Sequence, residues 1–447
     1  MNLLGARVVV MGLGRFGGGL GVTRWLCAQG AEVLVTDLAG PEDLAAPLEA
    51  LGPLLAQGRV RTRLGGHDSR DFAGADVVVA NPAVPHPWSN EYLLAAERAG
   101  RPITTEIRLL VERLDRSRTI GITGTAGKST TSAMVAHALR RLGRPVRFGG
   151  NIGGSLLEEA EAARTAGDLV VLELSSFMLH WLGAGVGGAA SRSVGWSPHV
   201  SAITNIRPNH LDWHGSFEHY LQSKLNLERF QSPGDVALRG EPIADAPIAG
   251  PGHEPARPGH PPIALQVPGA HNQVNAQLAL RIVHAATGDD PAAIAAALAD
   301  FPGLPHRLEL VAESDGRRFF NDSKSTTPEA TCMAVAAFDD PARIHLIAGG
   351  YDKGSDLASI AALAPTLGGL HTIGATGRRL AGGASHCFAD TLDVAIDRAL
   401  ARMGAGDILL LSPGCASWDQ FTNYEARGEA FRALVLERVG RPATPSR

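Results

Sequence analysis

The sequence predicts an α/β protein of three domains, each organised around a mainly parallel sheet. The length of 447 residues corresponds to about three domains of roughly 150 residues each. Short, β-branched apolar segments alternate with helical segments along most of the chain, which is the pattern of βαβ units. Glycine-rich or polar loops follow many of these strands, and ligand sites of open α/β sheets form at that end of the strands.

The composition excludes several classes of protein. Hydrophobic residues make up 45% of the chain and charged residues 19%, so several cores can be buried and global disorder is excluded. The formal net charge of −4 disfavours binding to nucleic acid or to an anionic membrane. Four scattered cysteines without a C-x-x-C pair indicate a reducing compartment, and no segment is apolar enough to span a membrane. We therefore expect a cytoplasmic protein.

Lysine is scarce, since only four of the 41 basic residues are lysine: Lys128, Lys224, Lys324 and Lys353. Arginine is a planar cation that is hard to deprotonate, whereas lysine is a compact cation with a usable amine. A chain that uses arginine almost everywhere keeps lysine where the two are not interchangeable. These four positions are therefore candidate site residues.

Residues 1–114 are predicted to form a Rossmann-like domain. A strand at 7–11 precedes Gly12-x-Gly14-x-x-Gly17, and a second strand at 32–36 ends next to Asp37. This spacing is typical of a loop that holds a pyrophosphate at a helix N-terminus. It does not distinguish NAD from another nucleotide diphosphate, and we favour a nucleotide-diphosphate substrate. A third strand at 76–80 leads into the turn that begins at Asn81, and a helix is expected at 106–114.

Residues 115–303 are predicted to form a P-loop ATPase-like domain. A strand at 119–123 leads into the glycine-rich loop and a helix that starts near Ser129. Backbone amides of such a loop surround phosphate groups, the lysine neutralises their charge and the serine can bind Mg²⁺. Ile122 stands where a strict phosphate loop has its first glycine. The residues predicted to bind ATP here are Gly124, Thr125, Ala126, Gly127, Lys128, Ser129 and Thr130.

Other polar groups of this domain also follow predicted strands. Glu173 ends a strand at 168–172 and is placed to bind Mg²⁺, although a structural polar strand end is an equal alternative. His210 lies after a strand at 200–204, close to Asp212 and His214 and 14 residues before Lys224. This combination modestly favours metal or anion chemistry over packing. The Pro/Gly-rich segment 239–262 is expected to be a surface loop, and helices are expected at 275–286 and 291–298.

Residues 304–447 are predicted to form a second Rossmann-like domain. Strands are expected at 318–321, 343–348, 371–373 and 407–411. Polar segments follow three of them, at 321–327, 349–354 and 412–424. Because the carboxyl ends of parallel strands meet at one edge of a sheet, we expect these segments to form one binding edge.

Together, these motifs resemble those of the Mur ligase family of ATP-dependent amide ligases. The shared motifs are Gly124-Thr-Ala-Gly-Lys-Ser129, Gly150-Asn-Ile-Gly153, Glu173-Leu-Ser-Ser176, Asn209-His-Leu-Asp212, Gly269-Ala-His-Asn-Gln-Val-Asn275 and Leu304-Pro-His-Arg307. Two C-terminal motifs are similar to those of the D-glutamate-adding members, at 321–326 and 412–421. The resemblance implies the three-domain architecture of that family. It also implies addition of D-glutamate to UDP-N-acetylmuramoyl-L-alanine through an acyl phosphate, in cytoplasmic peptidoglycan precursor synthesis, by a monomer.

The resemblance further implies roles for individual residues. Lys128, Glu173, His210 and Lys224 would be catalytic, and two Mg²⁺ ions would be held by Ser129, Glu173, His210 and a carbamylated Lys224. Beyond the phosphate loop, ATP would contact Asn272, Asn275, Arg307, Asp322 and Lys324. The UDP-substrate would contact Gly14, Arg15, Phe16, Asp37, Asn81, Asn151 and Ser175. D-Glutamate would contact Thr326, Lys353, Ser417 and Tyr424.

Several alternatives remain open at this point. Another member of the family would add L-alanine or a diamino acid, and a folylpolyglutamate synthase would share the same motifs. An NAD(P)-dependent oxidoreductase would use the glycine loop at 12–17, but the phosphate loop would have no role in it. A non-catalytic ATP-binding regulator would not need Lys128 for its function.

Overall fold

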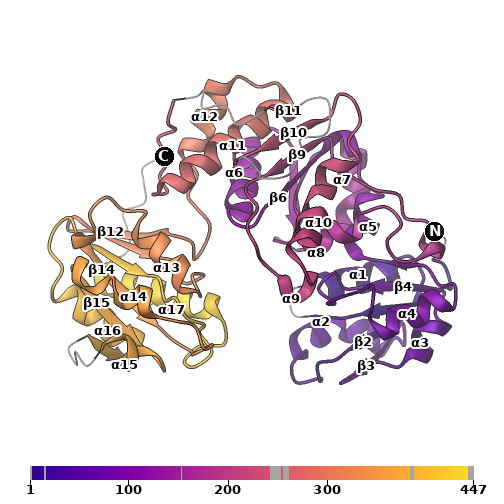
Figure 1. Ribbon diagram of the computed structural model, residues 1–447, viewed down its shortest axis with the longest axis horizontal. Coiled ribbons are helices and arrows are strands. Elements are labelled where there is room, and N and C mark those ends of the chain that lie inside the picture. The colour runs from indigo at the N-terminus through magenta and orange to yellow at the C-terminus, as the bar shows by residue number, and fades with distance from the viewer. Residues whose placement is uncertain are drawn as a thin grey trace. The chain divides into compact units, whose positions relative to one another are not determined.

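The computed structural model describes residues 3–14, 17–152, 154–241, 253–254, 261–382 and 387–440, and its strands form three sheets (Figure 1). The predicted α/β class is confirmed. By internal contacts the chain divides into two compact units, Met1–Pro261 with Asn275–Leu298 and Pro262–Val274 with Ala299–Arg447. The first unit holds two sheets and the second holds one. The domain boundaries near 114 and 303 remain predictions.

The N-terminal sheet has the order β3-β2-β1-β4-β5, and all of its strands are parallel. Its strands are β1 (Arg7–Met11), β2 (Glu32–Asp37), β3 (Val60–Leu64), β4 (Val77–Ala80) and β5 (Ile103–Thr104). Its helices are α1 (Gly18–Ala28), α2 (Ala45–Ala56), α3 (Ser69–Gly74), α4 (Glu91–Arg98) and α5 (Glu106–Val111). The three predicted strands are present, and α5 is shorter than expected because the chain turns at Glu112 and begins a 3₁₀ turn capped by Asp115.

The central sheet has the order β11-β10-β9-β6-β8-β7 and is also parallel. Its strands are β6 (Thr119–Thr123), β7 (Val146–Gly150), β8 (Leu169–Glu173), β9 (Val200–Ile203), β10 (Val236–Arg239) and β11 (His253–Glu254). The helices that follow them are α6 (Lys128–Arg141), α7 (Ala160–Ala166), α8 (Ser176–Trp181), α9 (Leu211–His214), α10 (Phe217–Arg229), α11 (Ala270–Thr287) and α12 (Pro291–Ala299). The segment 239–262 contains β11 and is therefore not wholly a loop, while residues 242–252 and 255–260 lie outside the described part.

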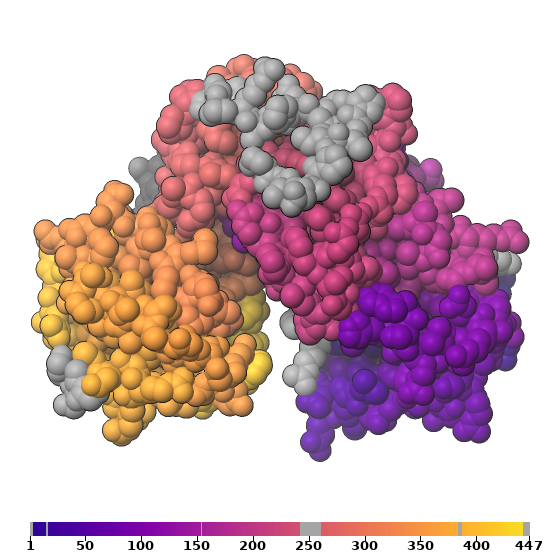
Figure 2. All heavy atoms as spheres, viewed as in Figure 1, coloured from indigo at the N-terminus to yellow at the C-terminus, as the bar shows by residue number. Residues whose placement is uncertain are grey.

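The C-terminal sheet has the order β12-β13-β17-β14-β15-β16, with β12 antiparallel to β13. Its strands are β12 (Glu309–Ser314), β13 (Arg317–Asn321), β14 (Ile344–Gly349), β15 (Gly369–Ile373), β16 (Phe388–Asp390) and β17 (Ile408–Leu411). Its helices are α13 (Pro328–Val335), α14 (Ala358–Ala361), α15 (Gly377–Leu380), α16 (Leu392–Leu400) and α17 (Tyr424–Val439). In the space-filling view the elements of this sheet and its helices, orange to yellow, form one continuous body (Figure 2). The β12–β13 hairpin was not predicted.

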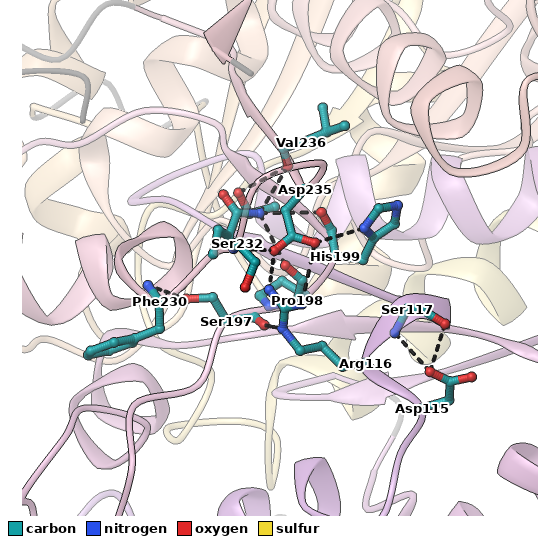
Figure 3. A network of polar contacts seen from close by, with 12 residues as sticks. Asp115, Arg116, Ser117, Ser197, Pro198, His199, Phe230, Ser232, Asp235 and Val236 are labelled. Atoms are coloured by element: carbon teal, nitrogen blue, oxygen red, sulfur yellow. Dashed lines mark hydrogen bonds and ion pairs between the residues drawn. The ribbon is translucent and has the colours of Figure 1, made fainter. Parts of the chain in front are cut away.

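The amino ends of β6, β9 and β10 are joined by a polar network around Asp235 (Figure 3). The Asp235 carboxylate accepts hydrogen bonds from the Arg116 guanidinium and from the Ser232 amide at 2.6 Å, and its Oδ1 lies 2.9 Å from Nδ1 of His199. Burial raises the pKa of Asp235, but the hydrogen bonds from Arg116, His199 and Ser232 outweigh it and hold the pKa below its usual value. The network holds together the amino ends of these strands, at the end of the sheet opposite the predicted phosphate loop.

Asp235→Asn is expected to lower the free energy of unfolding by about 2 kcal/mol, since it leaves the Arg116 guanidinium without its anionic partner. Urea unfolding, followed by hydrogen exchange of β6, β9 and β10, measures the change. Asp289→Asn serves as the control, because Asp289 pairs with Arg144 and is more exposed than Asp235. Its effect on the free energy of unfolding should be below about 1 kcal/mol. Equal effects of the two variants would contradict this assignment.

Two buried histidines lie side by side in the C-terminal sheet. His345 on β14 and His371 on β15 have ring centroids 5.7 Å apart, and Nδ1 of His371 is buried without a hydrogen-bond partner among the described residues. Burial, and then the charges of His345, Arg402 and Arg398, lower the pKa of His371 to about 4. His371 is therefore neutral in the folded protein at pH 7.

This lowered pKa predicts a loss of stability in mild acid. Between the unfolded pKa near 6.5 and the folded pKa, only the unfolded state takes up the proton, so stability falls as the pH falls through this window. We expect His371 to contribute about 2 kcal/mol of destabilisation between pH 7 and pH 5. Hydrogen exchange of β14 and β15 at the two pH values should show this loss in the native chain and a smaller one in His371→Gln. An unchanged pH dependence in the variant would refute the prediction.

Candidate active site

The predicted phosphate loop connects β6 to α6, and two of its glycines have no room for a side chain. A Cβ on Gly124 would lie 1.8 Å from Oγ1 of Thr204, and one on Gly127 would lie 2.6 Å from Oδ1 of Asn275. Gly127 also has φ +80°, where glycine is favoured. Asn205 holds the loop from outside, because its carbonyl accepts the Thr125 amide at 2.9 Å and its Oδ1 accepts the Ala126 amide at 3.0 Å.

Lys128, Ser129 and Thr130 form the first turn of α6 and are partly exposed. The ammonium of Lys128 donates to the carbonyl of Thr125 at 3.0 Å, so it lies over the loop. The helix is 14 residues long, and its first amides face the same loop. Amides, helix dipole and lysine together suit this loop to phosphate groups.

Glu173 ends β8, next to β6 in the sheet, and is 1% exposed. Its Oε1 accepts a hydrogen bond of 2.7 Å from Nδ2 of Asn151, whereas its Oε2 is buried and has no hydrogen-bond partner among the described residues. A buried carboxylate oxygen without a partner is costly unless a ligand satisfies it. This oxygen is suited to a cation.

Lys224 on α10 is buried beneath the phosphate loop. Its Nζ donates to the carbonyl of Gly124 at 2.8 Å and to Oγ1 of Thr123 at 3.2 Å, and lies 4.9 Å from the ring centre of Tyr220. Burial and then the charge of Lys128 lower the pKa of Lys224 well below its usual value, and Glu173 opposes this only in part. The amine is therefore poised to lose its proton, which an arginine could not do.

His210 precedes α9 in the left-handed conformation, with φ +52°. Its ring lies 4.9 Å from that of Phe177, measured between centroids. Burial is the main cause of its lowered pKa, and the charges of Lys128 and Lys224 add to it. The charge of Asp212 opposes this change in the pKa of His210. No cluster of three or more His, Cys, Asp or Glu side chains with metal-binding geometry occurs among the described residues.

A cavity of about 360 Å³ lies in the first unit, where the glycine loop after β1 meets the ends of β4 and β7 and the start of α8. Of the predicted UDP-substrate residues, four line it: Gly14, Asn81, Asn151 and Ser175. Asp37 does not line the cavity but accepts the Gly14 amide at 3.1 Å, so it shapes the loop. Arg15 and Phe16 lie outside the described residues, as does Gly153 of the Gly150–Gly153 motif.

The C-terminal unit gathers a second group of predicted residues at the carboxyl edge of its sheet. Asp322 follows β13 and is buried, and its Oδ2 accepts the Ser412 hydroxyl at 2.8 Å. Burial raises the pKa of Asp322 to about 6, although Ser325 and Ser412 oppose the change. Ser417 is buried, and its Oγ has no hydrogen-bond partner among the residues described. Such a hydroxyl is available to a ligand.

Two lysines of this unit lie over aromatic rings. Nζ of Lys353 is 4.8 Å from the ring centre of Trp418, and Nζ of Lys324 is 5.2 Å from that of Tyr424. Thr326 is partly exposed in the loop after β13. Lys353 is exposed, so its ammonium is accessible to an anionic ligand.

The remaining predicted ATP contacts lie on α11 and on the segment before β12. Asn275 accepts the Thr131 hydroxyl at 3.3 Å and borders the phosphate loop at Gly127. Asn272 donates to the Pro268 carbonyl at 2.6 Å, and Arg307 is exposed. Their predicted contacts with the adenine, phosphate or ribose groups of ATP remain predictions.

The sequence interpretation missed residues that support this site. Asn205 holds the phosphate loop and Tyr220 packs on Lys224, yet neither was predicted to have a role. Arg427 is 1% exposed and donates to the carbonyls of Ser323 and Cys415, which tie two loops of the C-terminal edge together. The position of Tyr220 one helical turn before Lys224 is a signal that could have been used. Arg427 lies in α17, and no local sequence pattern distinguishes it from the other residues of that helix.

Comparison with known proteins identifies the family of the chain. The model of the Mur ligase middle domain matches residues 122–242, and that of the Mur ligase glutamate ligase domain matches residues 306–415. A protein from Thermotoga maritima, UDP-N-acetylmuramate-alanine ligase, has the same fold with a TM-score of 0.54 at 19% identity, covering 97% of this chain and all of that one. The chain belongs to the Mur ligase family.

Relatives within the family cover almost the whole chain. The chain is 38% identical to the UDP-N-acetylmuramoylalanine–D-glutamate ligase of Roseiflexus sp. (strain RS-1), over 97% of this chain and 99% of that protein. It is 36% identical to the ligase of the same name from Geobacter metallireducens, over 97% of this chain and 98% of that protein. The ligase of that name from Anaeromyxobacter dehalogenans is 38% identical to this chain, over 98% of this chain and 99% of that protein.

Proposed function

We propose that this protein is an ATP-dependent ligase that adds D-glutamate to UDP-N-acetylmuramoyl-L-alanine, releasing ADP and phosphate. One observation carries the proposal beyond the similarity to its relatives. Asn151 lines the cavity and also donates to Glu173, which ends the strand beside the phosphate loop. A substrate that fills the cavity therefore reaches the place where ATP phosphates would bind.

The residues of the chain suit a reaction through an acyl phosphate. The terminal carboxylate of the nucleotide substrate attacks the γ-phosphorus of ATP, and ADP leaves. Lys128 and the loop amides offset the negative charge that moves from the γ-phosphate to ADP. The amine of D-glutamate then attacks the acyl carbon, and phosphate leaves. Lys353, Ser417, Thr326 and Tyr424 are the proposed contacts of D-glutamate, with Lys353 opposite its side-chain carboxylate.

We further propose that two Mg²⁺ ions act with ATP, held by Ser129, Glu173, His210 and Lys224. The unpartnered Oε2 of Glu173 fits one ion, since Mg²⁺ in nucleotide sites uses one or two protein oxygens together with phosphates and waters. Bound Mg²⁺ would stabilise charge on the transferring phosphoryl group. Lys224 would first lose its ammonium proton, and the amine would then add CO₂ and release a second proton. The resulting carbamate would supply an anionic oxygen ligand for Mg²⁺.

Amino-acid-dependent phosphate release from ATP, in the presence of UDP-N-acetylmuramoyl-L-alanine, tests the function. D-Glutamate should support turnover, and L-glutamate, L-alanine and a diamino acid should not. Turnover with one of these instead would reject the proposed substrate, and turnover with a folate would indicate a folylpolyglutamate synthase. Lys128→Ala should abolish turnover. If the protein were instead a non-catalytic ATP-binding regulator, this variant would keep its physiological role.

A second test addresses the oxidoreductase alternative. UDP-sugars should raise the melting temperature of the protein, and NAD(P) should leave it unchanged. No helix within the described residues has the length and apolarity needed to cross a membrane. We propose a cytoplasmic monomer, and sedimentation of the purified chain checks the oligomeric state.

A further inference from the structure

Glu106 is a buried acidic residue that the reaction above does not use. It is the first residue of α5, is 8% exposed, and lines the cavity with Ser155. The Ser155 hydroxyl donates to Oε1 of Glu106 at 2.5 Å and accepts the Leu157 amide at 3.2 Å. Among the described residues, no basic side chain forms an ion pair with Glu106.

The charged groups on the elements around Glu106 are either engaged elsewhere or exposed. On α5 itself, Arg108 donates to the carbonyls of Trp181 and Gly183, and Glu112 directly after the helix is exposed. On α1, Arg24 donates to the carbonyl of Ala50. In the 3₁₀ turn Leu157–Glu159, Glu158 is exposed and Glu159 pairs with Arg147.

Burial without a cation favours the neutral form of a carboxyl group. Burial accordingly raises the pKa of Glu106, and the hydrogen bond from Ser155 opposes this only in part. Because the Ser155 hydroxyl occupies Oε1, a proton on the carboxyl group is free to point from Oε2 toward a ligand.

The position of this acid relates it to the nucleotide. Ser155 is pressed against the first turns of α1, where a Cβ on Gly21 would lie 2.8 Å from the Cβ of Ser155. Gly14, Gly18 and Gly19 of the same loop and helix line the cavity with Glu106. A diphosphate at this helix N-terminus would lie in the same cavity as Glu106. An ionised carboxylate would repel it, whereas a carboxylic acid would donate to it.

We propose that Glu106 is a substrate-contacting residue whose protonated carboxyl group donates a hydrogen bond to a diphosphate oxygen of the nucleotide substrate. This inference rests on the proposed function, since it takes UDP-N-acetylmuramoyl-L-alanine as the ligand of the cavity. Binding of that anion beside the carboxyl group further favours its protonated form. Nucleotide binding therefore takes up a proton once the pH exceeds the pKa of the free site, and affinity falls by up to about tenfold for each further pH unit.

Titration calorimetry of UDP-N-acetylmuramoyl-L-alanine without ATP, between pH 6.5 and 8.5 in two buffers of different ionisation heat, tests this. The native protein should lose affinity as the pH rises and should take up a proton. Glu106→Gln, which keeps a neutral donor, should bind within about threefold of the native protein at low pH and should take up no proton. Glu112→Gln, at an exposed position directly after α5, should behave like the native protein.

Ser155→Ala provides a second measurement if the Glu106 variant does not fold. Removal of the hydroxyl that favours the carboxylate should move the loss of affinity to higher pH, which a purely structural role would not do. The same pH dependence in Glu106→Gln as in the native protein, or an equal loss of affinity at every pH, would overturn the inference. Absence of nucleotide binding to the native protein at any pH would overturn the proposed function itself.

Discussion

Lys224→Arg is expected to lower the rate of D-glutamate-dependent phosphate release by at least about a hundredfold. The variant keeps a positive charge but cannot provide a neutral amine at the buried position that hydrogen-bonds to Gly124 and Thr123. The proposed carbamate, and with it the ligand of one Mg²⁺, is therefore lost. Nucleotide binding in the cavity should change little, so the effect should lie in kcat.

The matched control for Lys224→Arg is Glu218→Gln. Glu218 lies on the same helix, is exposed, and accepts a hydrogen bond from Gln222 one turn later. This variant should retain full activity. Mass spectrometry of the intact native protein, in bicarbonate, should show one added CO₂ that the arginine variant lacks. Activity of Lys224→Arg within a few-fold of the native enzyme would exclude a carbamate-based mechanism.

The parts of the fold that depend on local sequence could be predicted. The phosphate loop lies between β6 and α6 as expected, because the apolar strand, the glycines and the helix are contiguous in the sequence. β3 was missed, since Arg61 and Arg63 alternate with few apolar residues and only Val60 is buried. β12 was missed because an antiparallel hairpin at the edge interrupts the βαβ pattern.

The residues that could not be predicted owe their properties to distant parts of the chain. Glu106 is buried and accepts a hydrogen bond from Ser155, 49 residues later in the sequence. Arg427 bonds Ser323, 104 residues earlier. Neither pairing leaves a periodic or motif-like signal in the sequence.

The scarcity of lysine was informative because it is a property of the whole composition. The four lysines lie at the two groups of predicted site residues, two in each unit.

Glu173→Gln is the second substitution for which we expect a large effect. It preserves the size of the side chain and an acceptor oxygen for the amide of Asn151, but it replaces the unpartnered carboxylate oxygen with an amide. A neutral group at this position binds Mg²⁺ more weakly and stabilises less charge on the transferring phosphoryl group. We expect kcat to fall by about a hundred- to a thousandfold and the Mg²⁺ concentration at half-maximal rate to rise.

Asp168→Asn is the matched control for Glu173→Gln, because Asp168 adjoins the other end of β8 and pairs with Arg147. It should lower stability without changing kcat or the Mg²⁺ dependence. A titration of phosphate release with MgCl₂, at saturating ATP and D-glutamate, separates the two variants. If Glu173→Gln lowered kcat without changing the Mg²⁺ dependence, Glu173 would act on the nucleotide substrate through Asn151 and not on the metal. That outcome would move Glu173 from the ATP site to the substrate cavity.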